Sequence, residues 1–177
     1  MMRNPWSRNV VQMLCLVMAA MAVIASPVLE PAAMAREPLR IGDTPPHVGV
    51  ADLVGRQQRI PDDVRGKVVL LHFWASGCSS CREEMPAMES LFAKYSKRGL
   101  VILAVNVGQR KEAVKAFVEG LKMTYPILLD PDRKMAQEYD VVSVPRTFIL
   151  DRNGLIRYKI VGGASMALLN KLVQSLL

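Results

Sequence analysis

Two cysteines three positions apart carry the clearest chemical signal in this chain of 177 residues. Cys78 and Cys81 enclose Ser79-Ser80, where an apolar strand gives way to a predicted helix. Unpaired backbone N–H groups and the positive end of the helix dipole meet at such a junction, and both stabilise a thiolate. Cys81 lies one helical turn further on the same face, close enough to form a disulfide with Cys78. The pattern predicts a redox pair in which Cys78 is the nucleophile and Cys81 resolves the mixed disulfide.

The same pair has two other possible uses. It can form a short structural disulfide, or it can contribute to a zinc site. Zinc normally needs four ligands, and His47 and His72 are the chain's only histidines. We therefore expect no metal, and nothing in the sequence implies a cofactor. The third cysteine, Cys15, lies in an N-terminal apolar run after Met13 and Leu14, which are too large for a lipidation site.

The cysteine pair needs a strand and a helix to position it, and the flanking sequence predicts both. The segment Lys67–Trp74 is β-branched and aromatic with no polar alternation. Such a run is typical of a central strand that is covered on both faces. Apolar residues then recur at helical spacing, so a helix is predicted from Ser79 to Arg98, ending at Gly99.

The rest of the chain alternates between strands and helices. A hairpin is predicted before the central strand, at Val48–Leu53 and Gln57–Ile60. The later elements are a strand at Leu100–Val107, a helix at Lys111–Leu121, a strand at Pro126–Leu129, a helix at Met135–Tyr139, a hairpin of Thr147–Leu150 with Leu155–Val161, and a helix at Ser165–Leu177. This order predicts an α/β fold with a central mixed β-sheet flanked by helices on both faces.

Composition limits the class of protein. Hydrophobic residues make up 51% of the chain and charged residues 22%, which excludes disordered, collagen-like and disulfide-dense proteins. The formal net charge is +7, but the basic residues are scattered and no basic stripe with interleaved aromatic residues is present. We therefore expect a packed globular domain with no nucleic-acid partner.

The N-terminal segment has the features of a secretory leader. Arg3 and Arg8 precede the apolar run Val10–Ala25, and Ala33-Met34-Ala35 fits the small-x-small pattern of a cleavage site. An uncleaved membrane anchor across residues 10–29 is the alternative. Its core of 16 residues is shorter than the ~20 that a spanning helix needs.

These features predict an exported protein of one domain. The expected organisation is a signal peptide or membrane anchor at residues 1–35, a linker at 36–46 and a domain at 47–177. Export predicts a periplasmic or otherwise extracytoplasmic location, where disulfide chemistry is favoured.

Four segments of the sequence occur in an order that resembles a known family. They are GKVVLLH, FWASGCSSCREEMP, LLDPDRKMAQEYDV and VPRTFILDRNG. From about Pro38 to Leu177, the chain resembles the thioredoxin-like proteins of the TlpA/ResA/DsbE type. The resemblance implies a thioredoxin-like fold with an inserted strand and helix at about Val105–Leu129. It also implies an extracytoplasmic thiol-disulfide oxidoreductase, and many members of the family serve cytochrome c maturation.

The resemblance also implies which residues bind a substrate. Pro145 takes the place of a cis-proline that faces the CxxC pair, although most X-Pro bonds are trans. Val144 would then offer its backbone to a partner in strand-like pairing. Gly77 stands where the family commonly has Trp, which alters the rim around Cys78 and puts the identity of the partner in doubt. Trp74 is expected to pack in the core while giving some cover over the site.

Two titratable residues are candidates for a catalytic or tuning role. Glu84 lies three residues beyond Cys81, where ResA-like members have an acidic side chain that could accept or relay the proton of the resolving thiol. The alternative is a solvent-facing helix acid, which is what we expect of Glu83. His72 lies six residues before Cys78, where thioredoxin has a buried acid. It is either a hydrogen-bonded core residue or, if cationic, a group that favours a Cys81 thiolate.

Three functions remain open. The leading hypothesis is a reductase of protein disulfides that is itself reduced by a membrane-bound electron donor, and the oxidase direction is possible with the same chemistry. The second is a thiol peroxidase of peroxiredoxin-like type. Such enzymes typically have Thr three residues before the reactive cysteine, whereas Ala75 stands three residues before Cys78. The third is a non-enzymatic binding module with a structural disulfide.

Overall fold

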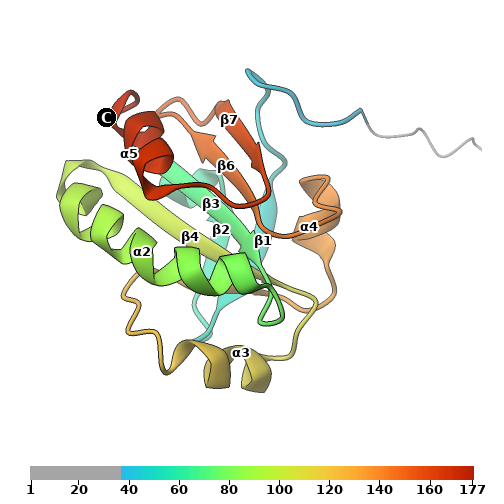
Figure 1. The fold of residues 1–177 in the computed structure, drawn as a ribbon. Helices are drawn as coiled ribbons and strands as arrows, with labels where there is room; N and C mark the ends of the chain where they lie inside the picture. Colours follow the sequence, from blue (N-terminus) through green and yellow to red (C-terminus); the bar gives the residue numbers. More distant parts are fainter. Residues whose placement is uncertain (1–36) are drawn as a thin grey trace, which may run out of the picture. The chain divides into compact units, whose positions relative to one another are not determined.

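The computed structural model describes residues 37–177. A seven-stranded sheet forms the centre of this part, in the order β2-β1-β5-β4-β3-β6-β7 (Figure 1). The predicted mixed sheet is confirmed, because β3, β4 and β5 are parallel neighbours whereas the other pairs are antiparallel. The predictions for residues 1–36, which include the leader, the anchor alternative and Cys15, lie outside the described residues.

The order of the elements follows the sequence prediction. The strands are β1 (Val48–Asp52), β2 (Gln57–Ile60), β3 (Val68–Trp74), β4 (Leu100–Val107), β5 (Ile127–Asp130), β6 (Arg146–Leu150) and β7 (Ile156–Val161). The helices are α2 (Ser79–Tyr95), α3 (Lys111–Val118), α4 (Lys134–Glu138) and α5 (Met166–Gln174), with short 3-10 helices η1 (Asp62–Val64) and η2 (Ser96–Arg98). The hairpin β1-β2 and the inserted pair α3 and β5 occur where they were expected.

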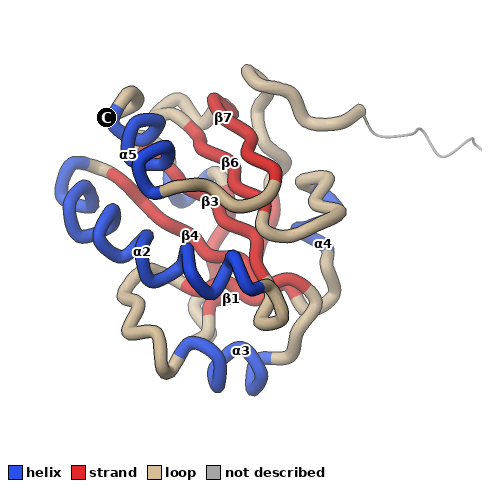
Figure 2. Tube along the Cα trace, in the orientation of Figure 1, coloured by secondary structure: helices blue, strands red, loops and turns tan. Residues whose placement is uncertain are grey.

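β3 is buried along its whole length, as its unbroken apolar sequence predicts. Side chains alternate across a strand, so Leu70 and Trp74 pack with α2 and α5 on one face. Leu71 and Phe73 pack on the opposite face, which α4 helps to cover. Figure 2 shows α2 and α5 along the near face of the sheet. The strand that leads to Cys78 therefore lies between two apolar layers.

Two helix ends illustrate how local sequence sets a boundary. After α2, the 3-10 turn η2 continues to Arg98, and Gly99 follows in the left-handed conformation with φ of 101°, as predicted. In contrast, α3 ends at Val118, short of the predicted Leu121. Gly120 follows this end, and glycine disfavours helix.

Residues 38–46 pack against the domain instead of forming the expected linker. They belong to the compact unit Pro38–Leu177. The Gly42 N–H donates to the Ile156 carbonyl at 2.8 Å, and the Ile156 N–H donates to the Asp43 carbonyl at 3.0 Å. Leu39 packs against the core. Prolines predicted a linker here, but the backbone groups of Gly42 and Asp43 pair with the start of β7.

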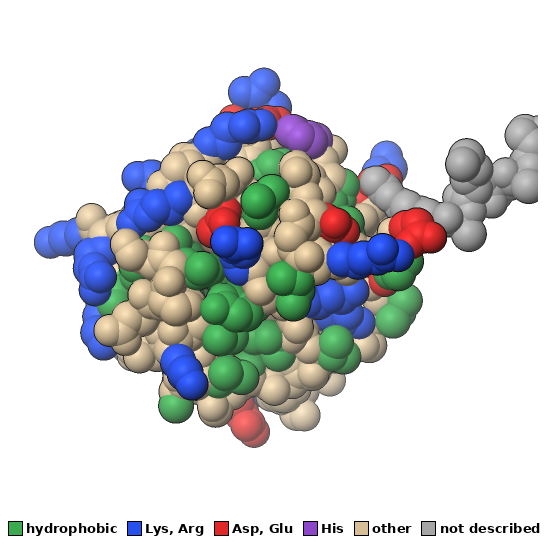
Figure 3. Space-filling model, turned by 90° about the horizontal axis from the view of Figure 1, so that it is seen from above, with side chains coloured by type: hydrophobic (Ala, Val, Ile, Leu, Met, Phe, Trp, Pro, Cys, Tyr) green, Lys and Arg blue, Asp and Glu red, His purple; other side chains and the backbone are tan. Residues whose placement is uncertain are grey.

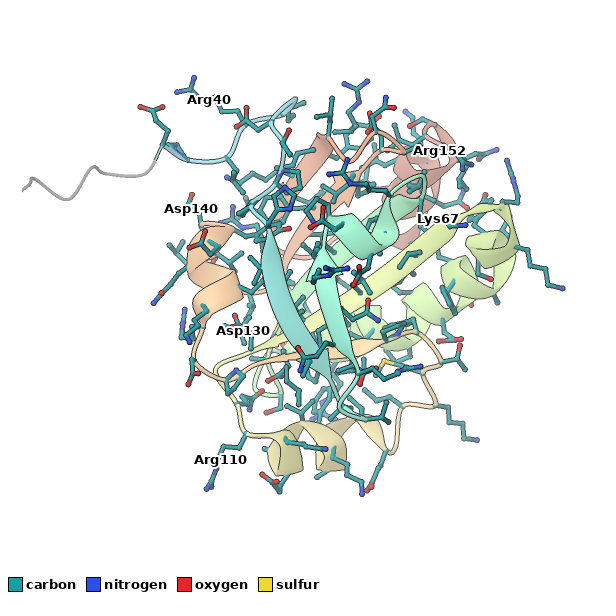
Figure 4. All side chains as sticks on the ribbon, turned by 180° about the vertical axis from the view of Figure 1, so that it is seen from behind. Arg40, Lys67, Arg110, Asp130, Asp140 and Arg152 are labelled. Atoms are coloured by element: carbon teal, nitrogen blue, oxygen red, sulfur yellow. A yellow bond between two sulfur atoms is a disulfide. The ribbon has the colours of Figure 1, made fainter. Side chains whose placement is uncertain are left out.

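Arg152 joins three distant parts of the domain. From the β6–β7 turn, its guanidinium donates to the carbonyl oxygens of Gly66, Arg98 and Leu177 at 3.2, 3.0 and 3.1 Å. Figure 4 shows Arg152 at the end of the sheet where Lys67 precedes β3. Arg152 thus links the residue before Lys67, the end of η2 and the C-terminal residue at the end of the sheet opposite the cysteine pair.

The surface carries dispersed positive charge. On the face seen in Figure 3, Lys and Arg side chains lie scattered among hydrophobic and other side chains. No helix within residues 37–177 has the length and apolar character needed to cross a membrane.

Candidate active site

The cysteine pair lies where β3 ends and α2 begins (Figure 1). Cys78 and Cys81 form a disulfide with a Cα–Cα distance of 5.3 Å. Cys78 is the N-cap residue of α2, and its Sγ accepts a hydrogen bond from the Cys81 N–H at 3.1 Å. Cys78 is partly exposed, whereas Cys81 is fully buried. The two sulfurs therefore differ in their access to a partner.

A polar network that the sequence patterns did not predict braces the turn before Cys78. Gln109, between β4 and α3, accepts a hydrogen bond from the Ser76 N–H at 2.8 Å and donates to the Ser76 hydroxyl at 2.6 Å. Asn106 donates to the same Gln109 oxygen at 2.8 Å. These groups meet because the parallel strands β3 and β4 end at the same edge of the sheet. A polar residue at the end of an otherwise apolar strand was the available sequence signal.

The peptide bond between Val144 and Pro145 is cis, as the resemblance implies. The register pairs Phe73 of β3 with Arg146 of β6, which places Pro145 beside the end of β3 and the turn that leads into α2. The Pro145 carbonyl accepts a hydrogen bond from the Gly162 N–H at 3.0 Å. Val144 is partly buried. The loop before β6 therefore lies next to the turn that carries the cysteine pair.

Glu84 is only 9% exposed, so it is not a solvent-facing helix acid. Its Oε1 accepts a hydrogen bond from the Ala164 N–H at 2.7 Å, and a Cβ atom at Gly163 would lie 2.7 Å from the same oxygen. Oε2 is buried without a hydrogen-bond partner in the described part of the chain. Burial raises the pKa of Glu84, the Ala164 N–H opposes this, and the charge of Glu83 adds to it. A carboxyl group with enhanced proton affinity thus lies one turn beyond Cys81.

His72 is fully buried in β3. Its Nδ1 lies 2.9 Å from the Thr147 hydroxyl, and its Nε2 has no hydrogen-bond partner within residues 37–177. Burial lowers the pKa of His72 to about 4. The imidazole is therefore neutral near pH 7, which contradicts the idea that a cationic His72 favours a Cys81 thiolate. The desolvation of the ring in an apolar layer is the physical reason.

Trp74, at the end of β3, packs in the core. Its side chain is fully buried, which agrees with the core packing expected from the sequence. The Trp74 ring lies 4.9 Å from the ring of Phe117 in α3, and the Arg82 guanidinium lies 4.4 Å from the centre of the same Phe117 ring. The three side chains form a stack that links α2 to α3.

Gly77 leaves the rim of the site open. It is exposed, and no atom of the described chain lies within 4 Å of the position that a Cβ would take. A Cβ atom would fit there without a clash. The Trp expected at this place in the family is therefore missing from an accessible part of the rim next to Cys78.

Comparisons with known proteins agree with this geometry. Residues 41–159 match the AhpC/TSA family. The thiol-disulfide oxidoreductase ResA of Geobacillus thermodenitrificans is 38% identical over 155 residues, which are 88% of this chain and 86% of that protein. The chain belongs to the AhpC/TSA family, as a ResA-like thiol-disulfide oxidoreductase. ResA of Bacillus subtilis is 34% identical to this ResA-like protein over 128 residues, or 72% of this chain and 70% of that protein.

Solved structures confirm the thioredoxin-like fold of this ResA-like oxidoreductase. The thioredoxin domain of a thiol-disulfide oxidoreductase from Bacteroides vulgatus matches with a TM-score of 0.70 at 27% identity, covering 78% of this chain and 99% of that one. StoA from Bacillus subtilis matches with a TM-score of 0.62 at 27% identity, covering 72% and 96%. The chemistry of the class is exchange between thiols and disulfides of proteins.

Proposed function

We propose that this ResA-like oxidoreductase reduces disulfides of partner proteins outside the cytoplasm, with partners such as those of cytochrome c maturation. The observation that carries the proposal is the asymmetry of the disulfide. Cys78 is partly exposed at the start of α2, whereas Cys81 is fully buried. An accessible sulfur can attack a partner, and a shielded one can attack only a partner that is already covalently held.

The reaction transfers two electrons from the reduced Cys78–Cys81 pair to the partner. The Cys78 thiolate attacks one sulfur of the partner disulfide, the partner S–S bond breaks, and the other partner sulfur leaves as a thiolate that takes up a proton. A mixed disulfide then joins Cys78 to the partner. The Cys81 thiolate attacks the Cys78 sulfur and releases the second partner thiol. The Cys78–Cys81 disulfide, the form seen in this structure, is the oxidised product.

The helix start supports the first step. The Cys81 N–H lies 3.1 Å from the Cys78 sulfur. In the reduced pair this N–H and the positive end of the α2 dipole stabilise negative charge on Cys78. The two hydrogen bonds between Gln109 and Ser76 support the same step, since they hold the turn that presents Cys78.

Glu84 supports the second step as a proton acceptor. Cys81 is buried and must lose a proton before it can attack. Glu84 follows it by one turn of α2, and burial raises the pKa of this carboxyl. A carboxylate with raised proton affinity accepts a thiol proton more readily than an exposed one does.

The loop that contains the cis-proline is the proposed docking site. The backbone of Val144 pairs with an extended segment of the partner, next to Pro145. Gly77 provides open space at the rim through which the partner disulfide reaches Cys78. These roles are supported by the position of the loop beside the end of β3.

Export and re-reduction complete the proposal. The leader-like residues 1–35 support an extracytoplasmic location, and an anchor at residues 10–29 would keep the domain at the membrane surface. Because such compartments are oxidising, the pair needs an electron source. A membrane-bound thiol donor supplies it in this proposal.

A trapping experiment tests the function. The variant Cys81→Ser, reduced and mixed with an extract of the exported proteins, should accumulate a mixed disulfide through Cys78, because the resolving sulfur is absent. Cys78→Ser is the matched control and should trap nothing. Recovery of no covalent partner, together with no reduction of insulin disulfides by the parent protein, would favour a structural disulfide.

The direction of the reaction is tested by the reduction potential of the pair in a glutathione titration. A reductase should be more reducing than the glutathione couple. A potential near that of the strongest dithiol oxidants, about −120 mV, would contradict the reductase direction. Rapid oxidation of the reduced pair by hydrogen peroxide would instead favour the peroxidase.

A further inference from the structure

The turn between β7 and α5 contacts the active site at two points, and the mechanism above does not use it. This β7–α5 turn consists of residues 162–165 (Figure 1). Gly162 donates its N–H to the Pro145 carbonyl at 3.0 Å, so one end of the turn is tied to the loop that contains the cis-proline. Ala164 donates its N–H to Oε1 of Glu84 at 2.7 Å. The turn therefore joins the proposed docking site to the proposed proton acceptor.

Gly163, between these two contacts, lies closer to Glu84 than a residue with a side chain could. A Cβ atom on Gly163 would lie 2.7 Å from Glu84 Oε1 and 3.6 Å from the Cβ atom of Ser80. Real Cβ atoms do not approach an oxygen so closely, so either the turn or the carboxyl group would have to move. The absence of a side chain thus allows the backbone of the turn to pack against the first turns of α2.

The turn is held at both ends, so the carboxyl group is the part that would move. The Gly162 hydrogen bond holds the first residue. At the other end, Ser165 is the N-cap of α5, and its side chain accepts a hydrogen bond from the Leu168 N–H at 3.2 Å. The Glu84 carboxyl, in contrast, is the end of a flexible side chain. The φ of Gly163 lies outside the left-handed region, so alanine can adopt the same backbone conformation.

The turn distinguishes the two oxygens of the Glu84 carboxyl group. Oε1 accepts the Ala164 N–H, whereas Oε2 is buried and has no hydrogen-bond partner within residues 37–177. Cys81 and Glu84 lie three residues apart on α2 and are both buried, so they are neighbours on one side of the helix. The oxygen that the turn leaves free is therefore the one available to accept a proton.

The segments around Glu84 carry few charges. Apart from the cysteines, their titratable side chains are Arg82 and Glu83 of α2, His72 of β3 and Lys171 of α5. The β7–α5 turn has none. Burial is the largest cause of the raised pKa of Glu84, the Ala164 N–H opposes it, and the charge of Glu83 adds to it. The turn thus influences the pKa of this carboxyl through its backbone.

We infer that Gly163 is a positioning residue for the second step of the reaction. Its missing side chain lets the β7–α5 turn hold Oε1 of Glu84 and leave Oε2 for the proton of Cys81. The S–H bond of Cys81 breaks, an O–H bond forms at Oε2, and the resulting thiolate attacks the Cys78 sulfur. This inference rests on the proposed function, since it names a residue that supports the same proton transfer.

The test compares Gly163→Ala with the parent protein in a single turnover. The probe is a peptide whose one cysteine forms a mixed disulfide with 2-thiopyridine. Attack of the Cys78 thiolate on the peptide sulfur releases pyridine-2-thione, which absorbance measures as capture. Attack of the Cys81 thiolate on the Cys78 sulfur releases the peptide thiol, which mass spectrometry measures after an acid quench. Capture should keep its rate, whereas release should slow about tenfold, because the carboxyl group is displaced.

The release step should also change its dependence on pH. The added methyl group displaces the carboxyl from the Ala164 N–H, which stabilises the charged form, so the pH midpoint of release should move to higher values. Gly49→Ala is the matched control, since it adds the same methyl group in β1 where no atom of the described chain lies within 4 Å. It should keep the parent's rate and midpoint. A parent-like rate and midpoint in Gly163→Ala would overturn the inference.

A double variant shows whether Gly163 acts through Glu84. In a Glu84→Gln background, Gly163→Ala should slow release no further, because the proton acceptor is already absent. A further tenfold loss in that background would overturn the inference but leave the reductase intact. No capture by the parent protein would instead contradict the reductase itself.

Thermal unfolding separates positioning from a structural role. Gly163→Ala should unfold at nearly the same temperature as the parent, because only the end of a flexible side chain has to move. A much lower midpoint together with slower capture would identify Gly163 as a structural residue and overturn the inference.

Discussion

Cys78 and Cys81 differ in exposure although they are only three residues apart. Cys78 is the N-cap of α2, and Cys81 lies on the side of the helix that faces the sheet. The same packing buries Glu84 one turn later and leaves Glu83 exposed. At the scale of single residues, the chemistry of the site is therefore set by how much water each side chain loses.

The substitution His72→Asn should change how stability depends on pH. His72 binds a proton near pH 6.5 when unfolded but only near pH 4 when folded, so the unfolded state takes up more protons between these values. Above pH 6.5 this difference does not lower the free energy of unfolding. As the pH falls from 6.5 toward 4, protonation of the unfolded state lowers it by up to about 3 kcal/mol. Urea unfolding at several pH values should show that the variant loses less of its free energy of unfolding at acid pH than the parent does. Parallel curves for both proteins would contradict the buried neutral histidine.

The substitution Glu84→Gln should slow the release of the partner and not its capture. An amide cannot accept the Cys81 proton, so resolution of the Cys78 mixed disulfide should fall about 10²-fold. In the parent protein the resolution rate should rise with pH through the raised pKa of Glu84, and this rise should be absent in the variant. Single-turnover kinetics measure both steps. Glu83→Gln is the matched control, and an equal effect of the two substitutions would remove Glu84 from the mechanism.

At the scale of elements, the site depends on three connections that end at one edge of the sheet. The β3–α2 turn carries Cys78, the β4–α3 connection carries Gln109, and the loop before β6 carries Pro145. The parallel pairing of β3 and β4 brings the first two together, and the antiparallel pairing of β3 and β6 brings in the third. The pairing of β3 with β4 and β6 therefore determines which loops lie close together at this edge of the sheet.

The substitution Gln109→Ala should weaken the thiolate character of Cys78. It removes the hydrogen bonds to both polar groups of Ser76, so the turn is no longer held at the start of α2. We expect alkylation of Cys78 in the reduced protein to require a higher pH and the reduction of model disulfides to slow several-fold. Lys111→Ala, an exposed change in the adjacent α3, is the control. An unchanged pH profile of alkylation would show that the hydrogen bonds between Gln109 and Ser76 do not position Cys78.

At the scale of the whole molecule, the N-terminal segment is part of the domain from Pro38 onward. It pairs with the start of β7 and packs Leu39 against the core. At the end of the sheet opposite the cysteine pair, Arg152 donates hydrogen bonds to three carbonyl groups from distant parts of the chain. Contacts between distant parts of the chain thus stabilise the sheet that positions the site.

The substitution Leu39→Ala should reduce stability although it lies in a proline-rich, linker-like stretch. Leu39 is partly buried against the core, so its truncation should cost about 1–2 kcal/mol. Ile41→Ala is the control in the same segment, since Ile41 is 66% exposed and should change stability by less than about 0.5 kcal/mol. Urea unfolding of the full chain measures both. Equal small losses would mean that the segment does not contribute to the fold.

The elements and the cysteine pair could be predicted from sequence because local patterns determine them. Apolar runs and their spacing predict β3 and α2, and the position of the cysteines at their junction follows from chain order. The helical segment was predicted to stop at Gly99. α2 ends at Tyr95, the 3-10 turn η2 continues to Arg98, and the left-handed φ of the next residue suits glycine. The family pattern added the cis peptide bond at Pro145, which base rates alone would not favour.

What the sequence by itself determined is this order of elements and the place of the reactive sulfurs. Only the tertiary structure decided the partners of the supporting residues: Glu84 meets Ala164 across 80 positions of sequence, His72 meets Thr147 across 75, and Ser76 meets Gln109 across 33. Local propensity acts over a few residues, whereas burial and hydrogen-bond partners arise from the packing of distant elements. The neutral state of His72 has that same origin, since desolvation depends on everything that packs around a group.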